Sequence, residues 1–153
     1  MNPELDPSEN SNTPATLEWI ADGEYSLDLI PKSLYDLCEN VLSCEKAQGE
    51  INIILTGDAL VRQLNGDFRN KDKTTDVLSF PSEDEDMAHE IYVSIPQVER
   101  QAPRFEATFD QEISRVIIHG LLHILGYDHI KAGERKIMRA KEEDYLQTTI
   151  YHK

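Results

Sequence analysis

The sequence is poor in cysteine and has no long apolar run. Only Cys38 and Cys44 occur among 153 residues, and their spacing within one expected helix points them to different faces, so no disulfide framework is expected. No stretch approaches the ~18 consecutive apolar residues of a membrane span. The N-terminus also lacks the basic-then-apolar pattern of a signal peptide. We therefore expect a cytoplasmic protein that has no membrane partner.

Positive charge is also scarce. The chain has 15 Lys and Arg against 29 Asp and Glu, which gives a formal net charge of −14. Proteins that grip duplex nucleic acid neutralise many phosphates with clustered Lys and Arg, so we expect no DNA partner. An enzyme that touches a short single strand at one basic spot is still compatible with this composition.

The remaining composition describes one domain of ordinary size. Hydrophobic residues make up 39% and charged residues 29% of the chain. Residues 1–14 contain three prolines, several Ser and Asn and almost nothing apolar, which predicts a disordered tail. We expect residues 15–153 to form a single domain, because no linker divides them.

Hydrophobic periodicity predicts strands that alternate with helices. Short apolar runs predict four strands, at residues 15–22, 50–55, 75–80 and 89–95. Apolar residues at i, i+3 and i+4 predict helices, at about residues 31–48, 58–66, 96–103, 108–125 and 134–147. The predicted fold class is α+β, with a small mixed four-stranded sheet layered with about five helices.

The segment 119–129 holds three of the five histidines. His119 and His123 are four residues apart, so on a helix they share one face at neighbouring turns. Gly126 can take a positive φ and end that helix, and the turn then brings His129 back towards the pair. Catalytic zinc is usually held by three protein ligands with one position left open. We therefore predict one Zn²⁺ per chain, bound by His119, His123 and His129.

The residue that follows the first histidine is Gly120. Zinc peptidases with similar histidine spacing have a glutamate there, which serves as the general base. Glycine has no side chain that could take a proton from water. A metallopeptidase-like hydrolase is therefore a weak alternative, and other hydrolytic chemistry is favoured.

Two blocks of the sequence resemble the YbeY family of bacterial endoribonucleases. One is the histidine segment 119–129, HGLLHILGYDH; the other is residues 64–81, which resemble the family's arginine loop and its T-D-V-L-S-F-P strand. The resemblance covers about residues 15–147. It implies a zinc-dependent, single-strand-specific endoribonuclease that matures ribosomal RNA, notably the 3′ end of 16S RNA, and acts in ribosome quality control. It also implies single-stranded RNA and the ribosome or ribosomal proteins as partners.

Residue roles follow from this resemblance and from the chemistry of RNA cleavage. Negative charge that develops on phosphoryl oxygens favours a nearby cation. Arg69 matches the family's key arginine, and its planar fork can pair two phosphate oxygens. Arg69 and the metal ligand His123 are the predicted catalytic residues, and Arg69, Lys71 and Lys73 are predicted to bind the substrate. Asp128 lies beside a predicted ligand and is expected to orient an imidazole by accepting its second N–H.

Several alternatives stay open. Arg62 adds a further cation to the local basic patch. His89-Glu90 stands where many relatives have a Gly-Asp pair, and we expect His89 to be a surface residue at a strand edge, with contact to the metal site as the alternative. Water and the 2′-hydroxyl of the RNA are both possible attacking groups. The main alternative function is a non-catalytic ribosome-assembly factor with a metal-stabilised fold. A purely structural zinc site is less favoured, because such sites usually have four protein ligands.

Overall fold

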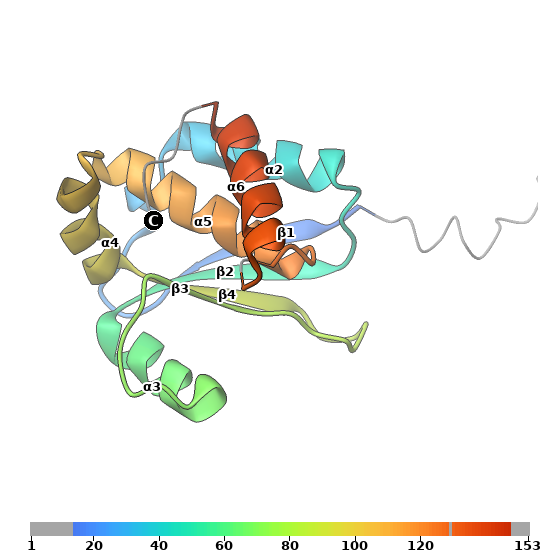
Figure 1. The fold of residues 1–153 in the computed structure, drawn as a ribbon. Coiled ribbons are helices and arrows are strands. Elements are labelled where there is room, and N and C mark those ends of the chain that lie inside the picture. Colours follow the sequence, from blue (N-terminus) through green and yellow to red (C-terminus); the bar gives the residue numbers. More distant parts are fainter. Residues whose placement is uncertain (1–13, 129, 148–153) are drawn as a thin grey trace, which may run out of the picture.

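The computed structural model describes residues 14–128 and 130–147, which form a sheet packed against helices (Figure 1). In chain order the elements are β1 (Thr16–Ala21), a 3₁₀ helix (Leu27–Leu29), α2 (Lys32–Cys44), β2 (Glu50–Thr56), α3 (Asp58–Arg69), β3 (Val77–Phe80), β4 (His89–Ser94), α4 (Ile95–Gln101), a second 3₁₀ helix (Ala102–Phe105), α5 (Phe109–Ile124) and α6 (Ala132–Leu146). The four strands and five α-helices of this part of the chain confirm the predicted α+β class. The expected N-terminal tail lies outside the described residues except for Pro14, which forms an isolated bridge with Gln48.

The sheet has the strand order β1-β2-β4-β3. Strands β1, β2 and β4 are parallel, whereas β3 pairs antiparallel with β4. Helix α2 connects the parallel strands β1 and β2, and a loop connects the antiparallel pair, as the two kinds of pairing require. The predicted mixed sheet is therefore confirmed, and β3 is an edge strand.

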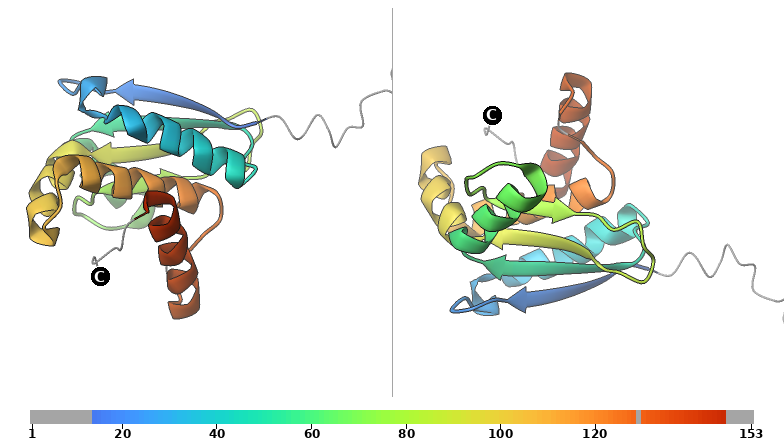
Figure 2. Two further views of the ribbon diagram at one scale, coloured as in Figure 1. Left: turned by 90° about the horizontal axis from the view of Figure 1, so that it is seen from above. Right: turned by 90° about the horizontal axis from the view of Figure 1, so that it is seen from below.

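The two faces of the sheet are covered differently. Helices α2 and α5 lie over one face, with α6 packed against α5, whereas α3 lies on the opposite face (Figures 1 and 2). The buried apolar core lies in the α2–α5 layer and includes Ile53 and Leu55 of β2 and Ile113 and Ile117 of α5. Because full burial of one such side chain contributes about 1.5–3 kcal/mol, this layer supplies most of the hydrophobic stabilisation.

Helix α5 has both of the ends that its sequence predicts. Thr108 and Gln111 form a capping box, in which each side chain accepts the backbone N–H of the other, at 3.1 Å and 2.9 Å. Gly126 takes a φ of +102° just after the helix, a conformation that costs glycine little. The chain therefore turns soon after His123.

One predicted boundary is wrong in a way that matters for the site. Helix α3 does not end at residues 65–66 but continues to Arg69, and Asn70 then ends it in the left-handed conformation with a φ of 58°. Gly66 suggested the end of this helix. However, one helical glycine costs only about 1 kcal/mol, less than burial of a neighbour such as Val61 contributes. Arg69 is therefore held on the last turn of a helix rather than in a turn.

Aspartate is a preferred N-cap residue, so the sequence predicts Asp58 as the cap of the same helix, and this prediction is wrong. The cap is Gly57, and Asp58 is the first helical residue. The Asp58 carboxylate instead accepts hydrogen bonds from Arg100, at 2.8 Å and 3.0 Å, and from the Ser94 hydroxyl at 2.7 Å. Arg100 holds the pKa of Asp58 below its ordinary value. The ion pair ties the start of α3 to the last turn of α4, and the Ser94 hydrogen bond ties it to the N-cap of α4.

Other boundaries shift less. Helix α2 ends at Cys44, β3 begins at Val77, and α6 begins at Ala132. Cys38 is buried, Cys44 is exposed, and both are free thiols, as expected. Within residues 14–128 and 130–147, no helix is long and apolar enough to cross a membrane.

Candidate functional site

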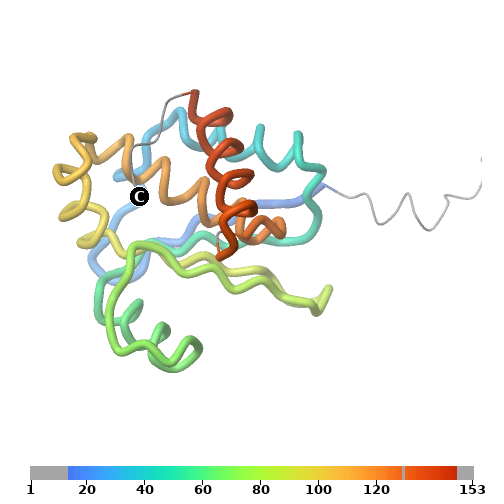
Figure 3. The backbone as a smooth tube through the Cα atoms, in the orientation of Figure 1, coloured from blue at the N-terminus to red at the C-terminus, as the bar shows by residue number. Residues whose placement is uncertain are grey.

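A pocket of about 430 Å³ lies between α5 and the segment that joins α3 to β3. Its lining residues come from both sides and from α4: Asn65, Arg69, Lys71, Lys73, Thr74, Thr75, Asp76, Val77, Leu78, Ser79, Gln97, Gln101, His119 and His123. After α3 the chain rises past the edge strand β3 towards the level of α5 (Figure 3). Five of the predicted site residues therefore meet at one pocket, although they come from two distant parts of the sequence.

His119 and His123 form one side of this pocket, here called the histidine wall. Their ring centroids are 6.0 Å apart, and the ring planes are inclined by 65°. Nδ1 of His119 lies 3.1 Å from Oε2 of Glu142 on α6, and Glu142 is buried. A buried carboxylate on one ring nitrogen fixes the orientation of an imidazole, as it commonly does beside metal-binding histidines.

Glu142 is absent from the predicted site. Its signal in the sequence is weak: it lies four residues after Met138, so it falls on the inward face of α6, where a charged residue is unusual. Asp128 was the predicted orienting carboxylate. It accepts the backbone N–H of Ile130 at 3.0 Å, and its role beside His129 stays a prediction.

The residues of the histidine wall fit a zinc ion. Two imidazoles one helical turn apart, one of them held by a carboxylate, match the usual surroundings of catalytic zinc. The third predicted ligand, His129, lies outside the described residues. Within residues 14–128 and 130–147, no three or more His, Cys, Asp or Glu side chains are placed to hold a metal ion. The complete three-histidine site therefore depends on His129 and stays a prediction.

The turn that leads to residue 129 is tied to α2 and α6 through Glu45. The Glu45 carboxylate accepts hydrogen bonds from the Tyr127 hydroxyl at 2.7 Å, from the Lys141 ammonium group at 3.2 Å and from the Tyr145 hydroxyl. Burial alone would raise the pKa of Glu45, but these hydrogen bonds hold it below its ordinary value. A charged carboxylate therefore anchors the start of this turn.

Gly120 lies where α5 approaches the sheet most closely. A Cβ atom at this position would lie 3.0 Å from Ile91 Cγ2, 3.2 Å from Val77 Cγ2 and 3.3 Å from Ser79 Oγ. The Ser79 hydroxyl also donates a hydrogen bond to the Gly120 carbonyl oxygen at 3.1 Å. A glutamate has no room there, so the packing of α5 argues against a peptidase mechanism independently of the sequence pattern.

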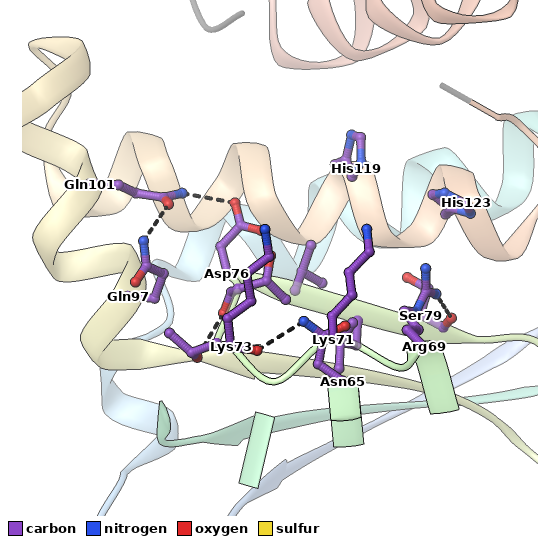
Figure 4. Close-up of a pocket in the computed structure, with 14 residues that line it drawn as sticks. Asn65, Arg69, Lys71, Lys73, Asp76, Ser79, Gln97, Gln101, His119 and His123 are labelled. Carbon is purple, nitrogen blue, oxygen red and sulfur yellow. Dashed lines mark hydrogen bonds between the residues drawn. The ribbon is translucent and has the colours of Figure 1, made fainter. Parts of the chain in front are cut away.

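Arg69, Lys71 and Lys73 form the opposite side of the pocket, here called the cation wall. Both lysine side chains extend from the segment after α3 towards α5 (Figure 4). Arg69 Nη2 donates to the Ser79 carbonyl oxygen at 3.1 Å, which steadies the guanidinium group at the edge of β3. Buried Asn65 donates through Nδ2 to the Lys73 carbonyl oxygen at 2.9 Å and accepts the Lys71 N–H at its own carbonyl oxygen at 3.1 Å. One residue of α3 therefore holds the backbone of both lysines.

The pocket ends, away from the histidines, in a polar network centred on Asp76 (Figure 4). Asp76 accepts hydrogen bonds from Gln101 at 2.9 Å and from Arg115 at 3.2 Å. Both donors also reach fully buried Glu112, at 2.6 Å and 3.0 Å. This network is not among the predicted site residues. Its signal is a glutamate on the buried face of α5 with an arginine three residues later.

Two residues singled out in the sequence lie outside the pocket lining. Arg62 pairs with Asp72 on the surface, with Nε 2.9 Å from Oδ1. His89 begins β4, which is a central strand and not a sheet edge. Its Nδ1 accepts the N–H of Ser82 at 2.8 Å, and burial lowers the pKa of His89. The basic patch therefore contributes only part of its cations to the pocket, and His89 has a local structural contact.

Known proteins resemble this chain over most of its length. The family profile described as Endoribonuclease YbeY matches residues 22–150. A protein of that name from Desulforamulus reducens is 36% identical over 77% of this chain and 88% of its own length. Another, from Thermotoga maritima, is 36% identical over 82% of this chain and 84% of its own length.

A solved structure shares the fold as well. The solution structure of TM1509 from Thermotoga maritima aligns with a TM-score of 0.64 and 34% identity, over 86% of this chain and 87% of its own. The resemblance first seen in two sequence blocks thus extends to the sheet and helices that carry them. The chain belongs to the YbeY family of endoribonucleases.

Proposed function

We propose that this protein is a zinc-dependent endoribonuclease that cuts single-stranded RNA, with one Zn²⁺ bound by His119, His123 and His129. The observation that carries the proposal is the pocket in which the cation wall faces the histidine wall (Figure 4). Cations opposite a metal site suit a reaction that adds negative charge to phosphoryl oxygens. The relatives' name, Endoribonuclease YbeY, agrees with this chemistry.

We assign a separate role to each group of residues at the pocket. Bound by His119, His123 and His129, a zinc ion would supply Lewis-acid chemistry toward a phosphoryl oxygen or a water molecule. Arg69 uses one N–H on the Ser79 carbonyl oxygen and offers other donors of its fork to the scissile phosphate. Lys71 and Lys73 neutralise phosphate charge from the same wall. Glu142 orients the His119 ring, and we assign the same role to Asp128 for a neighbouring ligand.

The substrate follows from charge. Three cations on a chain with a formal net charge of −14 are too few to grip a duplex, but they suffice for one or two phosphates of a single strand. We propose that the RNA is ribosomal, with the 3′ end of the small-subunit RNA as the site of maturation and with a role in ribosome quality control in the cytoplasm. A basic ribosomal protein would suit the acidic surface as a capture partner.

The first test compares the wild-type protein with His123→Ala on a labelled single-stranded RNA, with the metal content of both samples measured. We expect about one zinc per chain and cutting in the wild type, and loss of both in the variant. His89→Asn is the matched control, because it removes a histidine that does not line the pocket. This control should keep its zinc and its activity.

A different result would contradict catalysis. If zinc is present and neither protein cuts, or both cut equally, the reaction does not take place at this site. Ribosome association that survives chelation of the metal would then support the non-catalytic assembly factor. Conversely, cells that carry His123→Ala should accumulate small-subunit RNA with an unprocessed 3′ end.

A further inference from the structure

Three aromatic rings form a row beside the cation wall, here called the aromatic row: Phe68, Phe80 and Tyr92. The ring centroids of Phe68 and Phe80 are 5.4 Å apart and those of Phe80 and Tyr92 are 5.9 Å apart, both in edge-to-face contact. Phe80 and Tyr92 are half-buried, but Phe68 is 69% exposed. Packing accounts for the inner two rings and leaves the exposure of Phe68 unexplained.

Arg69 connects the aromatic row to the pocket. Its guanidinium carbon lies 5.9 Å from the centre of the Phe80 ring, while its Nη2 bonds to Ser79 and its side chain lines the pocket. Side chains alternate along a strand, so Ser79 faces α5 and Phe80 faces the side on which α3 lies. An RNA phosphate held by Arg69 therefore brings an adjoining nucleotide past the edge of β3 to the aromatic row.

The charges beside the aromatic row determine whether the phosphate or the base of that nucleotide can lie on it. Arg69 lies beside the Phe80 ring and attracts a phosphate to the pocket. Glu90 is the direct cross-strand partner of Phe80, and its carboxylate repels a phosphate from the sheet surface beside that ring. A nucleobase is neutral and has a flat π face, so it can stack on an aromatic ring without facing that repulsion.

We infer that Phe68, supported by Phe80, stacks a nucleobase next to the phosphate that Arg69 holds. The inference rests on the proposed function and adds to it the feature that selects single strands. A base must leave its helical stack to lie on a protein ring, so a paired strand cannot use this contact. Because every base has a π face, the contact selects for strandedness more than for sequence.

The test compares Phe68→Ala, Phe68→Leu and Phe68→Trp. The readouts are kcat/KM for a labelled single-stranded RNA and RNA affinity by fluorescence anisotropy with a chelator present. We expect kcat/KM and RNA affinity to fall by about 5- to 160-fold in the Ala and Leu variants, the equivalent of about 1–3 kcal/mol of stacking. The Trp variant should retain both. Ile137→Ala is the matched control, since Ile137 is 58% exposed on α6 and does not line the pocket. It should leave both quantities unchanged.

A second substrate series identifies the base. RNAs with a single abasic site at each nucleotide around the cut should lose affinity for the wild type at one position. At that position the Phe68→Ala protein should lose no more, because the variant already lacks the contact. Losses that add at every position would overturn the inference, and so would a Phe68→Leu protein equal to the wild type, because apolar area without a ring would then suffice.

The two proposals fail in different ways. If the wild type neither cuts nor binds single-stranded RNA, the proposed function falls and the stacking contact falls with it. If the wild type cuts and Phe68→Ala cuts equally well, only the stacking contact is overturned.

Discussion

The two walls of the pocket are built on different supports. The histidine wall is part of α5, a helix whose core residues Ile113, Ile117 and Leu121 are fully buried. The cation wall stands mostly on the segment after α3. Asn65 holds the lysine backbones of this segment, and the exposed Arg62–Asp72 pair joins it to α3. One wall is fixed by apolar burial, and the other is fixed by a few hydrogen bonds.

Because of this difference, we expect substitutions in one wall to change the stability of the protein and substitutions in the other to change RNA binding. A substitution at the contact between α5 and the sheet should change the free energy of unfolding, because it disturbs close packing. A substitution of a cation should change RNA binding and leave unfolding almost unaltered, because exposed side chains contribute little to stability. Substitutions in and around the two walls test how far this division holds.

The largest effect is expected for Gly120→Glu. The new side chain would meet Ile91 and Val77 at the helix–sheet contact and bury an unpaired carboxylate, which should cost about 3–5 kcal/mol. Gly133→Glu is the matched control: that glycine is in the exposed first turn of α6, with no atom within 4 Å of an added Cβ. It should gain up to about 1 kcal/mol, since glycine is a poor helix former. Urea unfolding of both variants measures the difference, and a Gly120→Glu protein as stable as the wild type would contradict the packing argument.

Asn65→Ala tests whether a substitution beside the cation wall can change both stability and RNA binding. Asn65 is 3% exposed and supports the cation wall, and its loss leaves the Lys73 carbonyl oxygen without its donor. We expect a loss of about 1–3 kcal/mol in the free energy of unfolding together with weaker RNA binding, because the backbone of Lys73 loses its side-chain donor. The Lys71 N–H keeps its bond to the backbone carbonyl oxygen of residue 65. Asn40→Ala, at an exposed position of α2, is the control and should stay within about 0.5 kcal/mol. Equal stability of the two variants would show that this wall needs no buried support.

Local signals made the histidine wall predictable. The capping box of Thr108 and Gln111, the four-residue spacing of the histidines and the positive φ of Gly126 all act within one segment. Each depends only on neighbours in the chain, so each can be seen in the sequence. The positions of the strands follow in the same way from hydrophobic periodicity. The mixed sheet follows from whether a helix or a short loop connects two strands.

Long-range contacts could not be predicted. Glu142 reaches His119 from 23 residues away, and Asp76 meets Arg115 from 39 residues away. The place of β4 between β2 and β3 is likewise set by pairing across the sheet. The end of α3 was misjudged for the same reason, because burial of Val61 and Asn65 outweighs the local preference of glycine.

Lys71→Ala and Lys73→Ala test whether the lysines of the cation wall change RNA binding without changing stability. Each lysine that contacts a phosphate should contribute about 0.7 to the slope of log affinity against log salt for a single strand. Each variant should therefore lower that slope by about this amount, with the unfolding midpoint unchanged. Arg62→Ala is the control, because Arg62 pairs with Asp72 and does not line the pocket. An Arg62→Ala slope as low as that of Lys71→Ala would mean that RNA extends beyond the pocket lining.

The smallest effect concerns His89, a histidine that lies outside both walls. Its Nδ1 accepts the Ser82 N–H at 2.8 Å, and burial lowers its pKa below the ordinary histidine value. As pH falls below about 6.5, the unfolded chain takes up a proton at His89 before the folded protein does. The stabilising contribution is therefore complete above that pH and is lost as pH falls through the lower folded pKa.

His89→Asn isolates this contribution, because the asparagine oxygen can accept the same N–H but does not titrate. Between about pH 7.5 and about pH 5.5, the melting temperature of the wild type should fall further than that of the variant. All other titrating groups are common to the two proteins, so they cancel in the comparison. Equal losses would mean that the Ser82 contact survives protonation of His89. If His89 instead took part in metal binding, a chelator would abolish the difference between the proteins. We expect the difference to persist, because His89 joins two backbone segments and the proposed metal ligands are His119, His123 and His129.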